Sequence, residues 1–310
     1  MNIVFFGTGV FGLPSLEAIR RSDHSLIAVV TSPDKPSGRH LAAKPSAVKS
    51  WALEHHVQIV EMGPSGDTRC FAQLQNFKAD LFVVISFGRI LNKQTLELPG
   101  QGAVNVHASM LPKYRGASPM QSAILNGEIE TGVSVMKMVE ALDAGAVSVT
   151  KKTVLESRET ILTLEPRLSI LASQALMESL GLIEDRKALW KDQDPDKTTY
   201  CSKIKKEDGH LDWDQSAQRL DRQVRAYLVW PGSYSFYKGK RLVVKKGRPE
   251  SSSAGSFKPG EIVRVSLEGI AVAASEGCLV LEELQLEGRT ALKASEFLKG
   301  TPLKVGELLE

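Results

Sequence analysis

Three polar residues in the first half of the chain supply an amide, an imidazole and a carboxylate. Asn105 and His107 lie in Asn-Val-His-Ala-Ser-Met-Leu-Pro at 105–112, and Asp143 lies in Glu-Ala-Leu-Asp-Ala-Gly at 140–145. An Asn amide can donate a hydrogen bond to an oxyanion, and a carboxylate can hold a His that transfers protons. Together these groups could pass an acyl group to an amine.

A strand is expected to position two of these side chains. Residues 103–106 are typical of the end of a buried strand, in which alternate side chains share one face. Asn105 and His107 therefore point the same way, and the small residues around Asp143 permit close approach by a ligand. No Ser or Cys lies in a nucleophile-elbow motif, so direct attack by a substrate amine is simpler than a covalent intermediate.

The bulk composition is that of an ordinary globular protein. The chain has 310 residues, a net charge of +3, 42% hydrophobic residues and three widely spaced cysteines. This length favours two domains, and the cysteines match neither a disulfide framework nor a zinc site. Without an apparent signal peptide or an 18-residue apolar run, we expect a cytoplasmic protein with no membrane partner and no metal. No oligomer interface is evident, so a monomer is the default.

The N-terminal part, 1–186, alternates short apolar runs with amphipathic stretches. A helix is predicted over 119–126, with Ser118 as N-cap and Gly127 closing it, and another over 159–180, ending before Gly181. This succession predicts a doubly wound α/β domain, which binds ligands beyond the carboxyl ends of its strands. The predicted strands are 3–6, 26–31, 81–86, 102–106 and 132–138.

A second, smaller domain is predicted over 207–310. The polar stretch 187–206 cannot fill a core and is interpreted as a linker. One helix is expected over 216–227, and several short strands separated by glycines indicate a small barrel or sandwich. These strands are 233–237, 240–245, 260–265, 269–274 and 278–286.

The sequence Gly-Thr-Gly-Val-Phe-Gly at 7–12 has the spacing of a dinucleotide-binding fingerprint. It follows a strand and opens a helix, and Asp34 follows the second strand. Asp34 lies past the strand end between two prolines, however, where it cannot readily reach a ribose. We therefore favour a tight strand-to-helix turn, and nicotinamide binding by an oxidoreductase remains an alternative.

Basic residues gather in three segments. The span 35–49 holds four of them and no acidic residue, a further three end the linker, and 238–248 holds six. Any one cluster is usually a solvated surface. Three clusters in a chain of net charge +3 indicate a surface able to hold a phosphate backbone, and small β-barrels commonly bind polynucleotides.

These features together resemble the methionyl-tRNA formyltransferase family over nearly the whole chain. The segments 105–116, 130–133 and 142–145 resemble folate-dependent formyltransferases in general, whereas the loop Thr-Ser-Pro-Asp-Lys-Pro-Ser-Gly-Arg at 31–39 is typical of the tRNA enzymes. Phe-Gly-Thr at 6–8, Thr-Tyr at 199–200, Lys-Ile at 203–204, Asp-Trp at 212–213 and Trp-Pro-Gly at 230–232 extend the resemblance. It implies a Rossmann-like N-terminal domain and an OB-like C-terminal domain.

The resemblance also implies an activity and a set of site residues. The formyl group of 10-formyltetrahydrofolate would pass to the methionine of initiator methionyl-tRNA. Asn105 would stabilise the oxyanion, His107 would donate to the same centre, and Asp143 would orient His107 and help remove the amine proton. The folate-binding residues would be Phe87, Gly88, Ser109, Met110, Leu111, Pro112, Leu142 and Gly145. The tRNA-binding residues would be Lys35, Arg39, Lys44, Lys203, Lys205, Lys206 and Lys245.

Two positions depart from the family pattern. Met110 replaces the commoner leucine, a swap that conserves volume. Ala146 stands where many members carry Asp or Pro, and Asp-Ala-Gly-Ala also occurs in sugar-nucleotide N-formyltransferases, which are the alternative. Those enzymes should lack the loop at 31–39, and their substrate gives no reason for three basic clusters.

Overall fold

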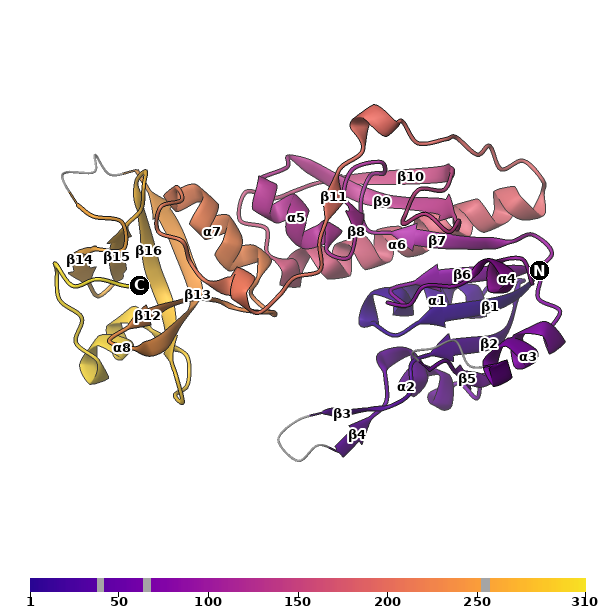
Figure 1. The fold of residues 1–310 in the computed structure, drawn as a ribbon, viewed down its shortest axis with the longest axis horizontal. Coiled ribbons are helices and arrows are strands. Elements are labelled where there is room, and N and C mark those ends of the chain that lie inside the picture. Colours follow the sequence, from indigo (N-terminus) through magenta and orange to yellow (C-terminus); the bar gives the residue numbers. More distant parts are fainter. Residues whose placement is uncertain (38–41, 64–67, 252–256) are drawn as a thin grey trace. The chain divides into compact units, whose positions relative to one another are not determined.

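The computed structural model describes residues 1–37, 42–63, 68–251 and 257–310. The chain forms two compact units (Figure 1). Unit 1 comprises 1–119, 130–154 and 165–202, and unit 2 comprises 120–129, 155–164 and 203–310. Two short segments that interrupt unit 1 along the chain, 120–129 and 155–164, therefore belong with the C-terminal unit.

Unit 1 is built on a seven-stranded sheet of order β10-β9-β7-β6-β1-β2-β5. The five neighbouring strands β7, β6, β1, β2 and β5 run parallel to one another. Strand β9 pairs antiparallel with β7 on one side and with β10 on the other. The order reverses at β1, which lies between β2 and β6, as in doubly wound sheets. The strands are β1 (Asn2–Gly7), β2 (Ser25–Thr31), β5 (Ile59–Glu61), β6 (Leu81–Ile85), β7 (Ala103–His107), β9 (Glu130–Lys137) and β10 (Val147–Val154).

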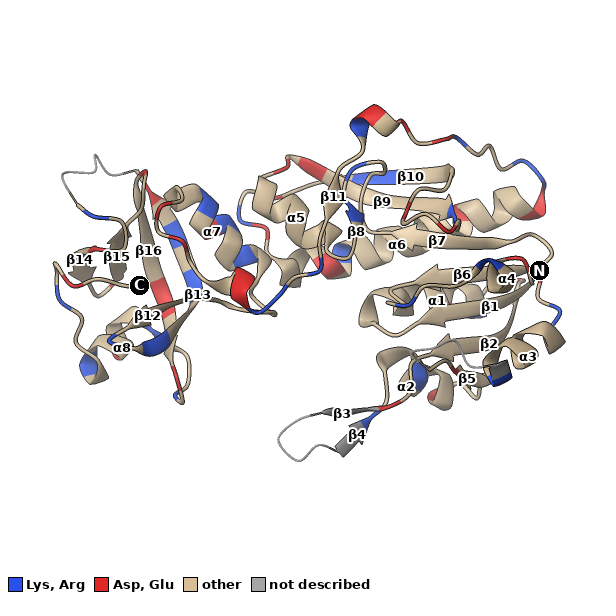
Figure 2. Cartoon of the chain, in the orientation of Figure 1, with Lys and Arg blue, Asp and Glu red and all other residues tan. Residues whose placement is uncertain are grey.

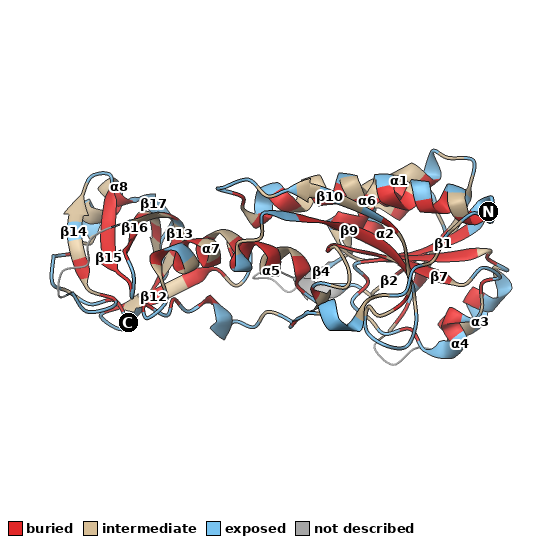
Figure 3. Ribbon diagram, turned by 90° about the horizontal axis from the view of Figure 1, so that it is seen from above, coloured by how far each residue is buried: buried red, intermediate tan, exposed pale blue. Residues whose placement is uncertain are grey.

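The central strands of this sheet are continuously apolar because both faces are covered. All five residues of β6 are buried, and Phe6 packs on Phe82 with ring centroids 4.9 Å apart. Figure 3 shows the buried residues concentrated along these strands. The helices of unit 1 are α1 (Leu13–Arg20), α2 (Ala47–Glu54), α3 (Thr68–Asn76), α4 (Lys93–Leu96) and most of α6 (Ile161–Glu184), with a 3-10 turn η1 (Val10–Gly12). Helix α5 (Pro119–Asn126) belongs almost entirely to unit 2.

The expected fold class is confirmed, with differences in detail. The helix predicted to end before Gly181 continues to Glu184, because the buried Ile183 extends its buried face past the glycine. Strands β5 and β10 were not predicted. Both lie at an edge of the sheet; β5 has only three residues, and β10 carries the polar run Thr-Lys-Lys-Thr between its valines, so neither shows a long apolar run.

Unit 2 is a six-stranded antiparallel sheet of order β12-β13-β16-β15-β14, with β17 paired to β16. Its strands are β12 (Ser233–Tyr237), β13 (Lys240–Glu250), β14 (Ile262–Ser266), β15 (Gly269–Ala273), β16 (Cys278–Leu286) and β17 (Leu292–Lys293). Helix α7 (Ala217–Ala226) begins at the N-cap Ser216 and buries Leu220 and Val224 in the core of this unit. Helix α8 (Ala294–Gly300) adds Phe297.

An ion-pair network fastens the segment 155–164 within unit 2. Asp221 of α7 is buried, and its two carboxylate oxygens pair with Arg158 Nη1 at 2.8 Å and with Arg225 Nε at 2.9 Å. The two arginines also donate to the carbonyls of Gly247 and Glu159. A buried carboxylate with two charged donors is fully compensated, which explains why it tolerates burial.

Other expectations concern absences. Within the described residues, no helix combines the length and apolar character that a membrane crossing requires. The same residues contain no cluster of His, Cys, Asp and Glu side chains suited to a metal ion. All three cysteines are buried, and none of them forms a disulfide among the described residues.

Candidate active site

The site lies at the carboxyl end of β7, where the strand presents alternate side chains. Asn105 and His107 fall two residues apart on this strand, and β7 pairs with β6 on one side and β9 on the other. His107 is buried and Asn105 is half-buried. No hydrogen bond within the described residues occupies the Asn105 side-chain amide, so its N–H groups are available to a ligand.

His107 and Asp143 face each other across a short gap. The His107 Nδ1 lies 3.7 Å from the Asp143 Oδ2, and both side chains are largely buried, at 7% and 13% exposure. This separation brings the predicted pair together but exceeds a hydrogen bond. Nδ1 is therefore available to interact with a ligand oxygen.

Backbone groups hold both members of the pair. The His107 Nε2 lies 2.8 Å from the carbonyl oxygen of Tyr114, and the Asp143 Oδ2 accepts from the Gly116 amide at 2.8 Å. Because a carbonyl only accepts, Nε2 carries a hydrogen and faces away from Asp143. These two contacts fix the rotation of the imidazole and of the carboxylate.

The backbone at two of these positions is left-handed. Tyr114 has φ +58° and Asp143 has φ +49°, a region that non-glycine residues rarely adopt. Each costs on the order of 1 kcal/mol or more, and such conformations persist only where surrounding contacts enforce them. The conformation lets the Asp143 carboxylate reach the Gly116 amide.

Residues missed by the sequence analysis supply those contacts. The segment between Trp190 and Ser202, expected to be a linker, runs along unit 1, and β11 (Tyr200–Cys201) pairs with β8 (Arg115–Gly116), as Figure 1 shows. Thr199 accepts from the amides of Tyr114 and Arg115. Gln193 bonds to Arg115 and to the Asp143 loop. Their polar composition resembles any connecting loop, so only the resemblance at 199–200 hinted at their place.

The predicted folate segment 109–112 forms a tight turn beside the pair. The Ser109 hydroxyl donates to the Lys113 carbonyl at 2.6 Å, and Ser134 of β9 bridges Ser109 and Leu111. The Leu111–Pro112 peptide bond is cis. Ser109 is fully buried, so its side chain shapes the turn, whereas Met110, Leu111 and Pro112 are half-buried and offer an apolar surface.

The other predicted folate residues also divide into buried residues that shape the backbone and exposed residues that offer surface to a ligand. Phe87 is buried and packs edge-on against Phe6, and Gly88 follows it with φ +68°. Leu142 is 62% exposed. A Cβ on Gly145 would lie 1.9 Å from the Lys137 carbonyl oxygen, so only glycine fits there. An exposed leucine beside a half-buried apolar turn suits the flat ring of a pterin.

The glycine-rich turn after β1 serves close packing. A Cβ on Gly7 would lie 2.6 Å from the Phe5 ring and 2.9 Å from the Ile85 carbonyl, and one on Gly12 would lie 3.0 Å from Phe5. Asp34 pairs with Lys49 at 2.7 Å. The fingerprint spacing is thus explained by contact between β1 and β6, and the acidic residue is already occupied.

The basic clusters are partly neutralised (Figure 2). Lys49 also pairs with Glu61, while Lys246 and Arg248 both pair with Glu282. Within the described part of the chain, the predicted tRNA-binding residues Lys203, Lys205, Lys206 and Lys245 form no ion pair. The first three are exposed, as is Lys44. Lys35 begins β3 (Lys35–Ser37), paired with β4 (Ala42–Lys44), and Arg39 lies outside the described residues.

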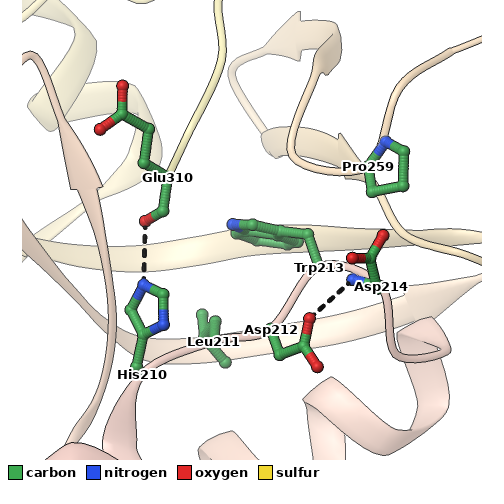
Figure 4. Close-up of a pocket in the computed structure, with 7 residues that line it drawn as sticks. All are labelled: His210, Leu211, Asp212, Trp213, Asp214, Pro259 and Glu310. Carbon is green, nitrogen blue, oxygen red and sulfur yellow. Dashed lines mark hydrogen bonds between the residues drawn. The ribbon is translucent and has the colours of Figure 1, made fainter.

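A separate cavity of about 310 Å³ lies in unit 2 and contains none of the predicted site residues (Figure 4). Its wall includes the carboxylates of Asp212, Asp214 and Glu310 beside His210 and Trp213. The His210 ring contacts the Glu310 carbonyl oxygen at 3.2 Å. An acidic wall repels phosphate and folate carboxylates alike, so this cavity does not suit the predicted ligands.

An open amide and an imidazole–carboxylate pair at a strand end of a mixed α/β sheet, joined to a small β unit, are the features of a formyltransferase. The formyl transferase family matches residues 1–180, and the formyl transferase C-terminal domain family matches 203–302. The chain belongs to the methionyl-tRNA formyltransferase family. The enzyme of that name from Methylacidiphilum infernorum is 40% identical over 313 residues, covering 100% of this chain and 98% of that protein. The one from Geotalea uraniireducens is 38% identical over 309 residues, with the same coverages.

A solved structure shares the fold at much lower identity. The N-formyltransferase from Helicobacter canadensis, in complex with folinic acid and dTDP-3-aminofucose, has a TM-score of 0.68 and 16% identity. The similarity covers 90% of this chain and 97% of that one. The sugar-modifying enzyme thus has the same fold, and this similarity carries no statement about its substrate for the present chain.

Proposed function

We propose that this chain transfers the formyl group of 10-formyltetrahydrofolate to the α-amine of methionine on initiator methionyl-tRNA in the cytoplasm. The observation that carries the proposal is full-length identity of 40% to a methionyl-tRNA formyltransferase, including the unit that follows residue 202. The site supports it, because Asn105, His107 and Asp143 offer the groups that this transfer requires.

The methionine amine attacks the formyl carbon, and a tetrahedral centre with a negative oxygen forms. The Asn105 amide and the His107 Nδ1 donate to this oxygen. Donors that are already in place for developing charge cost little reorganisation, and one such donor contributes roughly 10²- to 10³-fold in rate. Because the Tyr114 carbonyl accepts the Nε2 hydrogen, Nδ1 can donate only when the ring carries a hydrogen on both nitrogens, which is the imidazolium form.

Proton movement completes the reaction. The new C–N bond leaves the attacking nitrogen with an excess proton, and cleavage of the bond to the folate N10 requires one there. The Asp143 carboxylate receives the proton from the amine with its Oδ1, since Oδ2 is occupied by the Gly116 amide. Delivery to N10 balances the step, so no external acid or base is consumed.

The donor and acceptor would use different parts of the chain. The pterin of the folate rests against Leu142, Met110 and Leu111, with the 141–145 backbone beside it. Exposed lysines at 203, 205 and 206 and the basic loop around Arg39 contact tRNA phosphates. Nothing in this division requires a metal.

One assay tests the proposal against its alternative. The protein is incubated with 10-formyltetrahydrofolate and either methionyl-tRNA or an amino-sugar nucleotide, and the formylated product is measured. Formylation of methionyl-tRNA supports the proposal. Formylation of the sugar nucleotide alone assigns the chain to the sugar-modifying enzymes and refutes the tRNA activity.

A further inference from the structure

Gln193 occupies a central place among the loops of the site without facing the reacting groups. Its Nε2 donates to the carbonyl oxygens of Asp143 and Gly145, both at 2.8 Å. Its Oε1 accepts from the Nε and Nη2 of Arg115 at 3.0 Å and 2.8 Å. Both amide hydrogens and both oxygen lone pairs are therefore used.

The orientation of this amide follows from its partners. A guanidinium can only donate and a carbonyl can only accept, so the Gln193 oxygen faces Arg115 and its nitrogen faces the Asp143 loop. The side chain is half-buried, and the hydrogen bond to the charged Arg115 is stronger than one between neutral groups. Gln193 thus links the two loops in one orientation, with its amide oxygen on Arg115 and its amide nitrogen on the Asp143 loop.

The two loops are the ones that hold the imidazole–carboxylate pair. Arg115 directly follows Tyr114, whose carbonyl positions the His107 Nε2, and precedes Gly116, whose amide positions the Asp143 Oδ2. The bonds from Gln193 end on the carbonyls of Asp143 itself and of Gly145. A displacement of one loop against the other would change the 3.7 Å separation between His107 and Asp143.

The same bonds bear on the left-handed residues. Asp143 and Tyr114 adopt their conformations at a cost, and contacts from outside each loop must stabilise them. For Asp143, Gln193 supplies a bond at the residue and another two positions later. For Tyr114, Thr199 from the same segment supplies the bond to the backbone amide at 2.8 Å.

We propose that Gln193 is a positioning residue, which sets the geometry of the His107–Asp143 pair through the Arg115 and Asp143 loops. The catalytic consequence rests on the formyl transfer proposed above. Gln193 and Thr199 accordingly support the loops of the site from within the segment that precedes unit 2.

Kinetics test the catalytic consequence. Gln193→Ala should lower kcat by roughly 10- to 100-fold, because misplacement by about 1 Å can cost a factor of that size. KM for methionyl-tRNA and for the folate should change less than threefold, since Gln193 touches neither substrate. Gln193→Glu keeps an acceptor for Arg115 but loses both donors to the loop carbonyls, so it should resemble Gln193→Ala. Full activity of the Glu variant would contradict a role for the Asp143 loop.

A matched control lies next to Gln193. Asp192 is exposed and makes no hydrogen bond or ion pair among the described residues, so Asp192→Ala should retain kcat. Thermal midpoints of the three variants separate positioning from unfolding. A fall in kcat shared by Asp192→Ala would assign the effect to the segment as a whole and overturn the proposal.

A spectroscopic measurement separates this inference from the proposed function. The imidazole ¹⁵N and ¹H signals of His107, assigned with His107→Gln, are recorded without substrates in the full-length protein. Gln193→Ala should shift them, whereas the His210 signals of unit 2 and all signals of Asp192→Ala should remain. Unshifted His107 signals, or shifted signals with unchanged kcat, would refute the positioning role. Absence of tRNA formylation by the unmodified protein would instead refute the proposed function, and the signals would still decide the geometry.

Discussion

At the residue scale, the site depends on side chains that the fold leaves incomplete. Asn105 is half-buried with an unoccupied amide, and the His107 Nδ1 stands 3.7 Å from Asp143, too far for a hydrogen bond. Both groups are therefore available to a ligand oxygen.

Asn105→Ala removes one of the two oxyanion donors. We expect kcat to fall roughly 10²- to 10³-fold, because the developing charge loses a donor in a site shielded from water. The measurement is single-turnover formylation with saturating folate. The control is Asn76→Ala, which truncates an exposed asparagine at the end of α3. An unchanged rate for Asn105→Ala would remove this residue from the mechanism.

The residues of the site differ in how well the sequence could predict them. Asn105 and His107 were placed correctly because strand alternation is a local property, visible as apolar residues on either side. The Tyr114 carbonyl and the Gly116 amide could not be predicted, since a backbone group has no residue type to signal it. Gln193 lies 50 positions from Asp143, in a polar segment whose composition is that of a solvated loop.

At the element scale, too, features with a local sequence pattern could be predicted and features set by the surrounding fold could not. Buried strands such as β6 are evident from unbroken apolar runs, whereas β10 shows a mixed pattern because it lies at the sheet edge. Helix α6 continues through Gly181, although a glycine at this point of the sequence predicts the end of the helix. Burial of Leu180 and Ile183 on either side outweighs the low helix propensity of one glycine, which costs about 1 kcal/mol.

The low helix propensity of glycine predicts the effect of Gly181→Ala on stability. A Cβ at Gly181 would meet no atom within 4 Å, and the residue is exposed within α6. Alanine should stabilise the protein by about 0.5 to 1 kcal/mol, because it restricts the unfolded chain and favours the helix. Urea unfolding followed by circular dichroism measures the change. The contrasting variant is Gly145→Ala, which should destabilise because its Cβ meets the Lys137 carbonyl; a gain there would contradict the packing argument.

A pH effect is expected where the segment after α8 returns to β12. The Glu307 carboxylate accepts from Lys238, the Lys304 amide and the Tyr237 hydroxyl, and Lys238 foremost lowers the pKa of this carboxyl to about 2. A depressed carboxyl pKa adds stability above the unfolded value of 4.5, and that stability is lost as pH falls toward 2. Glu307→Gln should therefore lower the thermal midpoint at pH 7, and the difference from the unmodified protein should shrink between pH 4.5 and 2.

The control for this effect is Glu54→Gln, which alters an exposed carboxylate that forms no ion pair within the described residues. Its midpoint should follow that of the unmodified protein at every pH. A Glu307→Gln difference that stayed constant down to pH 2 would exclude the ionised carboxylate as the source of the stability.

At the scale of the whole molecule, the chain combines the proposed acyl-transfer site with exposed lysines suited to a polyanion. A net charge of +3 understates the available basic surface, because many lysines and arginines pair with acidic neighbours. Among the described residues, the lysines without such partners are the candidates for tRNA contact, and Lys203, Lys205 and Lys206 are their densest group along the chain. The charge pattern in the sequence predicted this segment, whereas the neutralisation of Lys49 by Asp34 and Glu61 is visible only in the fold.

Binding of tRNA through these lysines makes the reaction sensitive to salt. Each phosphate neutralised releases counterions, so log kcat/KM for methionyl-tRNA should fall linearly with log salt, with a slope of roughly −0.7 to −0.9 per contact. Replacing Lys203, Lys205 and Lys206 together by alanine should reduce that slope by about 2 to 3 while leaving the KM for folate unchanged. The matched control replaces Lys93, Lys187 and Lys299, three exposed lysines each paired with an acid on or beside its own helix. Equal reductions in both triple variants would attribute the salt effect to net charge, and an unchanged slope in the first would exclude these lysines from the tRNA surface.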